Sequence, residues 1–461
     1  MNKIEPLIFD DKCETSEVEL KTELSIPAWL NGDLVRNGPG LFTFNQLKLN
    51  HWFDGMAVLH KFSFENGKVK YFSKFLQSEA YLSLKNNNTV ETDEFATTPK
   101  QSIFKHVINL LKGTITDNNN VNIIKFGDYY LVMTETDNHM LLDKKSLSIA
   151  GKLKYKDGIK LVINLAHPIV ESGYFFNIGA NFGKVSFYYL YKTHIKSNKR
   201  EIIAKIPTKS SAYMHSFAMT ENYFILYENP LRLSLFKLFF SGKPFIENYV
   251  WRDIPVEFTI LDKNGNIVLK IKSENFFCFH MVNAYEENGK VYLDLIIYPD
   301  ASIIQALYLN SKIDAKSISS RLFRYIFDID EKKCEIVDLN IANIEFSVIN
   351  PNYAKKAYNI LYAVAGNVVG LQLNTLVKIE LNTNKIVNSW FIEGCYPGEP
   401  VFVPNPENKS EDCGVIISII GDIVNNTSFL LILDAASFTE ISRIRLPHLL
   451  PMGLHGSYYN N

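Results

Sequence analysis

The stretch Asn-Phe-Phe-Cys-Phe-His-Met-Val-Asn-Ala-Tyr, residues 275 to 285, carries one histidine inside an apolar run bounded by Glu274 and Glu286. It is followed by Glu-Glu-Asn-Gly and then by Lys-Val-Tyr-Leu-Asp-Leu-Ile-Ile-Tyr, so Asn288-Gly289 predicts the turn of a β-hairpin. His280 should then lie on the first strand of that hairpin, where we expect a buried backbone. A buried imidazole needs a polar partner.

Two other histidines repeat this arrangement. His167 is followed by a Glu-Ser-Gly turn at 171–173, and His215 is followed by Thr-Glu-Asn at 220–222. The separations from histidine to turn residue are 173−167=6, 222−215=7 and 289−280=9 residues. Three hairpins with a histidine at nearly the same point would direct the three imidazoles toward a shared focus in a pseudo-symmetric array.

A fourth histidine, His455, lies between Gly453 and Leu454 on one side and Gly456 on the other, and the glycines permit close approach of backbone or ligand. Taken singly, each of the four would more often be a structural histidine. Their joint pattern favours a metal site, because four neutral imidazoles suit a first-row divalent ion such as Fe(II), Zn(II) or Cu(II). The remaining histidines lack this setting and are expected to be structural or exposed: His51, His60, His106, His139, His194 and His448.

The pattern along the rest of the chain predicts an all-β fold. Short alternating runs such as 68–75, 129–135 and 429–434 are flanked by Asn, Asp, Gly or Pro, and helical periodicity is scarce. Many short strands over this length indicate a β-propeller with blades of about 40 to 50 residues. The histidine spacings agree, since 215−167=48 is one blade, 280−215=65 is one blade with an insertion, and 455−280=175 leaves three or four.

We expect one propeller domain over 1–461, with residues 1–35 as a polar leader and Arg-Asn-Gly-Pro-Gly-Leu-Phe at 36–42 as a turn cluster. Two β-sandwich domains are the competing layout. They are less favoured because no linker rich in Pro, Gly or Ser divides the chain.

Composition restricts the partners and the compartment. With 48 basic and 49 acidic residues there is no electrostatic footprint for nucleic acid, and 32 Phe with 24 Tyr favour an apolar ligand. The five cysteines are scattered, and the N-terminus shows no signal-peptide pattern, so a cytoplasmic location is expected. No stretch approaches the ~18 apolar residues of a transmembrane helix.

Two apolar segments, 103–112 and 231–240, interrupt the strand pattern and combine large apolar residues with Lys or Arg. They could lie flat in a membrane interface, which would make the protein peripheral on a membrane surface. Alternatively, they are helices that cap the propeller with their apolar sides inward. The residues expected at a membrane contact are Phe104, Leu110, Leu111, Leu235, Phe236, Phe239 and Phe240.

Ordered sequence blocks link the chain to a known family. They are Arg-Asn-Gly-Pro-Gly (36–40), His-Trp-Phe-Asp-Gly-Met (51–56), Thr-Glu-Thr (134–136), Ala-His-Pro (166–168), Met-His-Ser-Phe-Ala-Met-Thr (214–220), Phe-His-Met-Val-Asn-Ala-Tyr-Glu (279–286), Glu-Pro-Val-Phe-Val-Pro (399–404) and Gly-Leu-His-Gly (453–456). From Ile26 onward the chain resembles the carotenoid cleavage oxygenases. The similarity is greatest to the animal-type branch, which contains β-carotene oxygenases and the retinal pigment epithelium retinoid isomerase.

The resemblance implies a seven-bladed β-propeller with a helical cap over an Fe(2+) ion on its axis. The histidine motifs of the family fall on His167, His215, His280 and His455. Three family glutamates that accept hydrogen bonds from the far nitrogens of ligand imidazoles match Glu135, Glu345 and Glu399, of which Glu345 has the least sequence context. A carboxylate at that nitrogen fixes the imidazole tautomer and strengthens the other nitrogen as a ligand.

The implied reaction is cleavage of a conjugated double bond in a carotenoid or apocarotenoid by O2, giving two aldehydes from an apolar polyene. The alternatives are a retinoid ester isomerohydrolase, a stilbene-cleaving dioxygenase and a non-catalytic propeller binding module. One departure is Thr-Thr-Pro-Lys-Gln at 97–101, where the animal branch commonly has Pro-Asp-Pro-Cys. Without that cysteine for lipid attachment, membrane contact would depend on the apolar segments alone.

Overall fold

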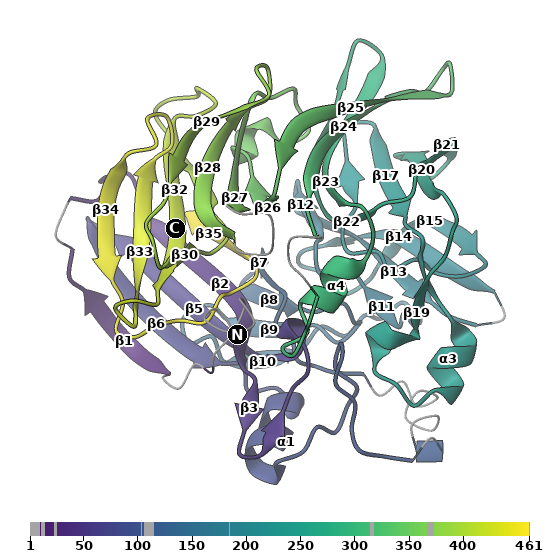
Figure 1. The fold of residues 1–461 in the computed structure, drawn as a ribbon, viewed down its shortest axis with the longest axis horizontal. Coiled ribbons are helices and arrows are strands. Elements are labelled where there is room, and N and C mark those ends of the chain that lie inside the picture. Colours follow the sequence, from purple (N-terminus) through teal and green to yellow (C-terminus); the bar gives the residue numbers. More distant parts are fainter. Residues whose placement is uncertain are drawn as a thin grey trace.

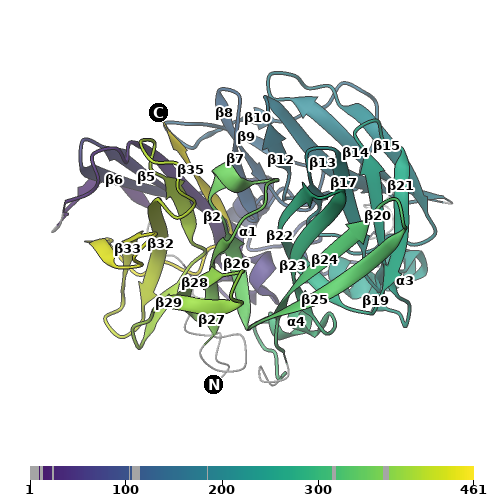
Figure 2. The same cartoon turned by 90° about the horizontal axis from the view of Figure 1, so that it is seen from above.

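The structure is a computed structural model, and it describes residues 10, 14–22, 25–102, 104–105, 115–183, 185–313, 318–366 and 373–460. Among these residues, seven antiparallel sheets of four or five strands surround a common axis as a seven-bladed β-propeller (Figures 1 and 2). The expected fold class is therefore confirmed.

Blades one to four follow the chain with one exception, the C-terminal strand of blade one. Blade one contains β1 (Thr15–Leu20), β6 (Lys68–Phe75), β5 (Met56–Glu65), β2 (Gly32–Leu41) and β35 (Gly456–Asn460); blade two contains β7 (Asn122–Phe126), β8 (Tyr129–Met133), β9 (Met140–Asp143) and β10 (Ile149–Lys152). Blade three contains β11 (Ile163–Asn164), β12 (Ile169–Glu171), β13 (Tyr174–Asn181), β14 (Ser186–His194) and β15 (Glu201–Thr208); blade four contains β16 (Ala218–Met219), β17 (Tyr223–Glu228), β20 (Val256–Asp262) and β21 (Ile267–Ser273).

Blades five to seven complete the ring in sequence order. Blade five contains β22 (Phe277–Glu287), β23 (Lys290–Tyr298), β24 (Arg321–Asp328) and β25 (Lys333–Ala342); blade six contains β26 (Ile344–Val348), β27 (Ile360–Gly366), β28 (Leu373–Glu380) and β29 (Lys385–Trp390). Blade seven contains β30 (Cys395–Pro397), β31 (Val401–Pro404), β32 (Gly414–Asp422), β33 (Thr427–Asp434) and β34 (Glu440–Arg445).

The ring is closed by the C-terminal strand. β35 pairs antiparallel with β2, so that Gly32 faces Asn460 and Arg36 faces Gly456. This pairing places His455, which directly precedes β35, beside the N-terminal segment of the chain.

Residues 36–42 were expected as a turn cluster, and this prediction was wrong for most of the segment because β2 continues to Leu41. The glycines here serve close packing, since a Cβ on Gly38 would lie 2.5 Å from Gly453 Cα. Pro39, which has no N–H to donate, lies at an irregularity in the pairing with β5 between Pro39 and Leu41.

Hydrophobic cores fill the spaces between neighbouring blades. For example, Phe258 of blade four packs in one cluster with Leu293 and Phe327 of blade five. The alternating run 68–75 forms β6 with buried Val69 and Tyr71 and exposed Lys68 and Lys70, as its pattern predicts.

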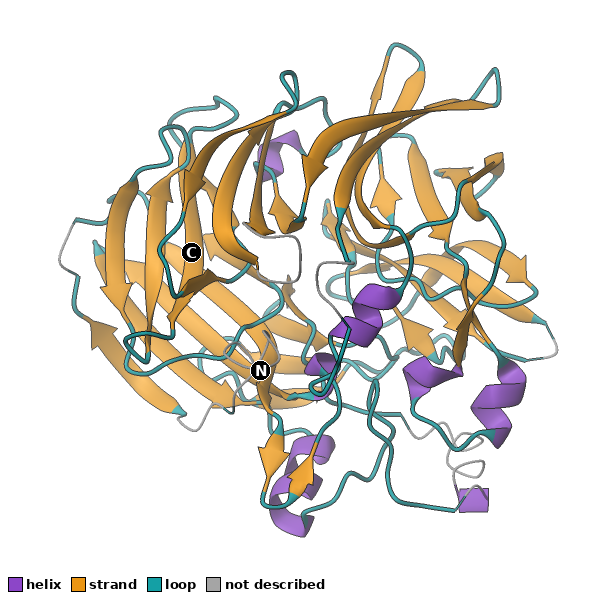
Figure 3. Cartoon of the chain, in the orientation of Figure 1, coloured by secondary structure: helices purple, strands orange, loops and turns teal. Residues whose placement is uncertain are grey.

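The described helices are short, and most of them, together with the connecting loops, cap one end of the ring, whereas η4 lies between β26 and β27 at the other end (Figure 3). They are α1 (Glu79–Asn87), α3 (Leu235–Phe240), α4 (Ser302–Ala306) and the 3-10 turns η1 (Trp52–Asp54), η2 (Phe245–Asn248) and η4 (Pro351–Tyr353). Two small ladders accompany them: β3 (Thr43–Phe44) with β4 (Leu47–Lys48), and β18 (Leu231–Leu233) with β19 (Tyr249–Trp251).

The interval of 65 residues between His215 and His280 contains the expected insertion. Between β17 and β20 the chain forms β18, α3, η2 and β19, which leave the blade and contribute to the cap. The apolar segment 231–240 is accordingly split into a buried strand and the helix α3. In the part of the chain that the structure describes, no helix has both the length and the apolar character to cross a membrane.

Candidate metal centre and its cavity

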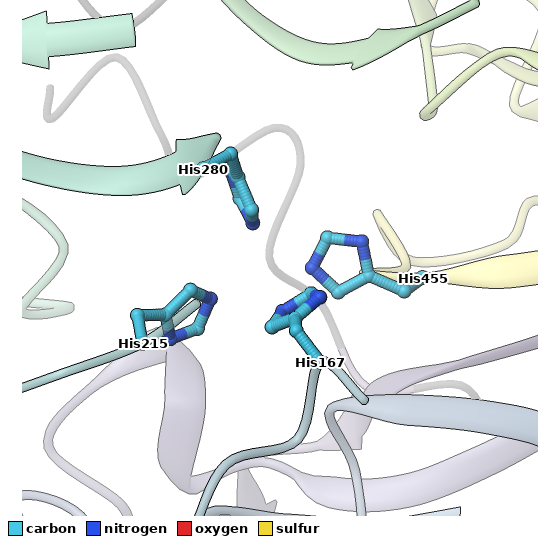
Figure 4. Close-up of side chains that lie close together, drawn as sticks. All are labelled: His167, His215, His280 and His455. Atoms are coloured by element: carbon cyan, nitrogen blue, oxygen red, sulfur yellow. The ribbon is translucent and has the colours of Figure 1, made fainter. Parts of the chain in front are cut away.

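Four imidazoles converge on the propeller axis (Figure 4). One nitrogen from each of His167, His215, His280 and His455 lies within 4.8 Å of the others. The ring of His167 is central to the group, with ring centroids 4.5 Å from His215, 5.1 Å from His280 and 4.4 Å from His455. This spacing is close enough for one ion to bind between them.

Each histidine reaches the axis from the inner edge of a blade. His280 lies on β22, as the hairpin pattern predicts, and its hairpin turns at Asn288 and Gly289, which both have positive φ. His167, His215 and His455 differ from that expectation because they lie before the first residues of β12 (Ile169), β16 (Ala218) and β35 (Gly456) rather than on a strand. The histidines nevertheless lie at similar distances from their hairpin turns, and their imidazoles converge on one point.

Hydrogen bonds from side chains fix the backbone around these histidines. Asn177 Nδ2 donates to Leu165 O at 2.8 Å, and Asn122 Nδ2 donates to Ala166 O at 2.8 Å, which holds the segment that enters His167. Ser216 Oγ donates to Phe279 O at 2.6 Å and links the segment of His215 to that of His280. The imidazoles are therefore presented on a rigid frame.

Three carboxylates orient three of the imidazoles through the nitrogen that faces away from the focus. Nδ1 of His215 lies 2.5 Å from Glu135 Oε1, Nδ1 of His280 lies 2.8 Å from Glu345 Oε2, and Nδ1 of His455 lies 2.8 Å from Glu399 Oε1. They are the three glutamates that the motif comparison names, although the sequence did not assign each of them to a particular histidine. Since a carboxylate accepts a hydrogen bond only from a protonated Nδ1, Nε2 is left to face the focus.

Each of these carboxylates has a further buried donor, which the sequence analysis missed. Tyr213 Oη donates to Glu135 at 3.0 Å, Tyr298 Oη donates to Glu345 at 3.0 Å, and Arg36 donates to Glu399 at 2.6 Å. Tyr213 lies two residues before His215, and Arg36 lies in the first family block, so both residues are close to recognised motifs. No sequence pattern, however, identified the carboxylates to which they donate.

Each of the seven blades contributes one residue to the set of four histidines and three glutamates. Blades one, three, four and five supply His455, His167, His215 and His280, while the β8–β9 connection of blade two supplies Glu135. Strand β26 of blade six carries Glu345, and the β30–β31 connection of blade seven carries Glu399.

The chemistry of the donor set fits a first-row divalent metal ion. Nε2 of His167 and Nε2 of His280 are buried and have no hydrogen-bond partner among the described residues, so a bound cation would satisfy them. Burial, together with the three neighbouring imidazoles, lowers the pKa of His167 well below its ordinary value. A neutral imidazole is the form that coordinates a metal.

A cavity of about 1370 Å³, including its open mouth, adjoins the histidines. Aromatic and aliphatic side chains dominate its walls: Trp52, Phe53, Phe95, Val121, Phe182, Leu238, Phe245, Phe279, Ile303, Leu307 and Phe346. Polar groups also line it, among them Glu94 and Thr116. Such a container suits an elongated apolar ligand with few polar groups.

The block His-Trp-Phe-Asp-Gly-Met ties the cap to the propeller. His51 is fully buried, and its Nε2 lies 2.9 Å from Ile304 O of α4, so it has the structural role expected for it. Asp54 accepts from Ala96 N at 2.7 Å and from Thr97 Oγ1 at 2.6 Å, which anchors the loop after α1.

The residues expected at a membrane contact differ in their exposure to solvent. Phe104, Phe236 and Phe240 are 77%, 75% and 61% exposed, whereas Leu235 and Phe239 are half-buried. Leu238 of the same helix faces the cavity, so α3 combines the capping and the exposed apolar roles. Leu110, Leu111 and His106 lie outside the described residues.

Comparison with known proteins agrees with this geometry over nearly the whole chain. The family profile described as retinal pigment epithelial membrane protein matches residues 9–460. The chain is 32% identical to mouse β,β-carotene 15,15'-dioxygenase, over 97% of this chain and 90% of the mouse protein, and 32% identical to the chloroplastic carotenoid cleavage dioxygenase 8 of Arabidopsis thaliana, over 96% and 84%. Among solved structures, a variant of the Synechocystis apocarotenoid oxygenase superimposes with a TM-score of 0.87 at 25% identity, covering 98% of this chain and 97% of the other.

Proposed function

We propose a function from one premise, which is that the chain belongs to the family described as retinal pigment epithelial membrane protein, the carotenoid cleavage oxygenases. The protein is a non-haem iron(II) dioxygenase that cleaves a conjugated double bond of a carotenoid or apocarotenoid with O2 and releases two aldehydes. His167, His215, His280 and His455 bind the iron, and Glu135, Glu345 and Glu399 orient three of them.

The convergence of four imidazole nitrogens within 4.8 Å at an aromatic-lined cavity carries this proposal. Ferrous iron held there would supply the activation of O2 and the redox chemistry that a protein side chain lacks. Each carboxylate keeps its imidazole in the Nδ1-protonated tautomer, so that the ligand nitrogen carries no proton that must be displaced.

The cavity walls perform the remaining tasks of the reaction. Phe53, Phe279 and Phe346 line the space beside the histidines and present flat apolar surfaces to a conjugated chain. They exclude water from the reacting bond and restrict the polyene to a few orientations.

Aerobic incubation of the iron-loaded protein with a panel of carotenoids and apocarotenoids tests the proposal. Mass spectrometry should find paired aldehyde products, with oxygen from ¹⁸O2 in both. Conversion of a retinyl ester without oxygen uptake would instead identify an isomerohydrolase, and cleavage of a hydroxylated stilbene alone would identify a stilbene oxygenase. A protein that binds polyenes with no stoichiometric metal would be a binding module.

We also propose that the protein associates with a membrane surface through an apolar patch defined by Phe104, Phe236 and Phe240. Lys105 and Lys237 lie next to these side chains in the sequence, which suits anionic headgroups. Contact at this patch would let an apolar substrate pass from the bilayer to the cavity that Leu238 lines from the same helix.

A further inference from the structure

Glu94 is a buried carboxyl group in the wall of the cavity, and neither the metal centre nor its supporting hydrogen bonds use it. Its side chain is among the least exposed acids of the protein, with 3% exposure for the residue. It lines the same cavity as the histidines, next to Phe95 and Thr116. A carboxyl group in an otherwise apolar wall costs free energy unless it is paired or neutral.

The hydrogen bonds of Glu94 occupy one oxygen only. Oε1 accepts from Thr116 Oγ1 at 2.7 Å and from Thr92 Oγ1 at 3.3 Å. Among the described residues no donor reaches Oε2 and no cation pairs with Glu94. Among the residues that the structure describes, Oε2 of Glu94 therefore remains open to a hydrogen bond with a ligand.

Other buried acids are satisfied by the protein. Asp294 is paired with Arg324, and Glu228 is paired with Arg232. Asp54 has no cation among the described residues, but donors reach both of its oxygens. Glu94 differs from all three because both of its hydrogen bonds to described residues go to Oε1, while the residue lines the cavity.

The backbone that carries Glu94 is fixed, so the carboxyl group has a defined position. Glu94 N donates to Thr97 O at 2.9 Å, and Ile246 N donates to Phe95 O at 3.0 Å. Asp54 holds Ala96 and Thr97 from the other side. A polar group placed on such a rigid loop is preorganised for binding, which lowers the entropic cost of recognition.

We propose that Glu94 is a specificity-determining residue that donates a hydrogen bond from its neutral carboxylic acid to an oxygen atom on the substrate. The preferred substrate is then an apocarotenoid with an aldehyde or hydroxyl group at its end, and not a hydrocarbon carotene. This inference deepens the proposed function and rests on it for the class of substrate.

The electrostatic surroundings support the neutral form. Burial, with the carboxyl groups of Asp54 and Asp117 nearby, raises the pKa of Glu94 to about 8, although the Thr116 and Thr92 hydroxyl groups oppose this shift. At neutral pH the proton on the group can be donated to a carbonyl or hydroxyl oxygen. With a hydrocarbon end, the buried carboxylic acid of Glu94 would be left without a hydrogen-bond partner, which disfavours binding. A wholly apolar wall has no such group to leave unpaired, so it would distinguish the two ends only weakly.

Binding to the metal-loaded protein without O2 tests this role separately from catalysis. Three probes are titrated by fluorescence quenching: an apocarotenal, the corresponding hydrocarbon polyene and a hydroxystilbene. Glu94→Leu removes the donor at similar volume, and Glu94→Gln retains an N–H donor as the matched control. We expect Glu94→Leu to weaken apocarotenal binding about 10-fold, in line with loss of one buried hydrogen bond, without weakening hydrocarbon binding. Glu94→Gln should keep the wild-type preference.

Three outcomes would overturn the assignment. The first is unchanged apocarotenal binding by Glu94→Leu with a normal metal content. The second is an equal loss for the apocarotenal and the hydrocarbon, which would indicate a packing role. The third is a loss confined to the hydroxystilbene, which would identify a phenolic ligand. Because no turnover is measured, absence of cleavage in air would contradict the proposed function without changing this result.

Discussion

Arg36 and Glu399 form an ion pair that joins the first and last blades behind the metal centre. Arg36 Nη1 lies 2.6 Å from Glu399 Oε2, with side chains only 5% and 15% exposed. The other carboxylate oxygen of Glu399 accepts from His455. Glu135 and Glu345 each accept from a tyrosine hydroxyl instead of a cation: Tyr298 donates to the oxygen of Glu345 that His280 does not use, whereas Tyr213 and His215 share Oε1 of Glu135. Among the described residues, one of the three imidazole–carboxylate pairs is therefore linked to a cation, and the other two are not.

Substitution of Glu399 should affect metal binding and stability together, whereas substitution of Glu345 should affect mainly metal binding. Either Glu→Gln change removes a carboxylate from an imidazole and should weaken metal affinity about 10- to 100-fold. Glu399→Gln also leaves Arg36 buried without a counter-charge, which should lower the free energy of unfolding by about 3–5 kcal/mol. Metal titration and urea denaturation of both variants check this. Equal losses of stability would contradict the role of the ion pair.

Removal of a central imidazole should abolish stoichiometric metal binding. His280 is expected to be decisive because its buried Nε2 faces the focus without a protein partner. His280→Ala should purify with negligible iron, while His194→Ala, a substitution at a histidine on β14 away from the site, should bind iron as the wild type does. Elemental analysis gives the metal content. Full iron occupancy in His280→Ala would contradict the assignment of the four histidines.

The sequence predicted the centre better than it predicted the surroundings of the centre. His167, His215 and His280 were identifiable because each precedes a tight turn at a similar distance, and turn residues leave a strong local signal. Asn288 and Gly289 do form that turn with positive φ. Because such turn patterns involve only residues that are adjacent in the chain, they can be recognised in a single sequence without knowledge of the fold.

Long-range partners left no comparable signal. Arg36 and Glu399 are separated by 363 residues, and their contact exists only because β35 closes the ring against β2. The glycines of the first block suggested a turn, since a glycine in a sequence does not reveal whether it gives conformational freedom or close packing. Glu94 was missed for the same reason, because its burial follows from the cap and not from its neighbours in sequence.

The exposed phenylalanines of α3 should control association with lipid. Phe236 and Phe240 are 75% and 61% exposed, and their rings contact each other in a tilted arrangement with centroids 5.3 Å apart. Their replacement by serine removes apolar area that could enter an interface, worth roughly 1.5–3 kcal/mol for each fully buried side chain. Cosedimentation with vesicles containing anionic lipid should fall at least 10-fold.

A matched control for this experiment is available outside the patch. Phe391, which follows β29, is 47% exposed and lies on a different blade. Phe391→Ser should leave cosedimentation unchanged. Similar losses for the control and the α3 variant would show a general effect of surface hydrophobicity and contradict a defined contact through α3.

The stability of the protein should fall as pH rises through the range in which Glu94 ionises. Burial raises the pKa of Glu94 from 4.5 to about 8, so between these values the folded chain keeps a proton that the unfolded chain has released. The folded state then binds more protons than the unfolded state, and linkage requires its stability to decrease with rising pH and to level off above about pH 8. Glu94→Gln cannot ionise and should lack this decrease, so that it becomes more stable than the wild type at pH 9. Urea denaturation of both proteins at pH 6 and pH 9 measures the difference, and parallel pH profiles would show that Glu94 is already charged at neutral pH.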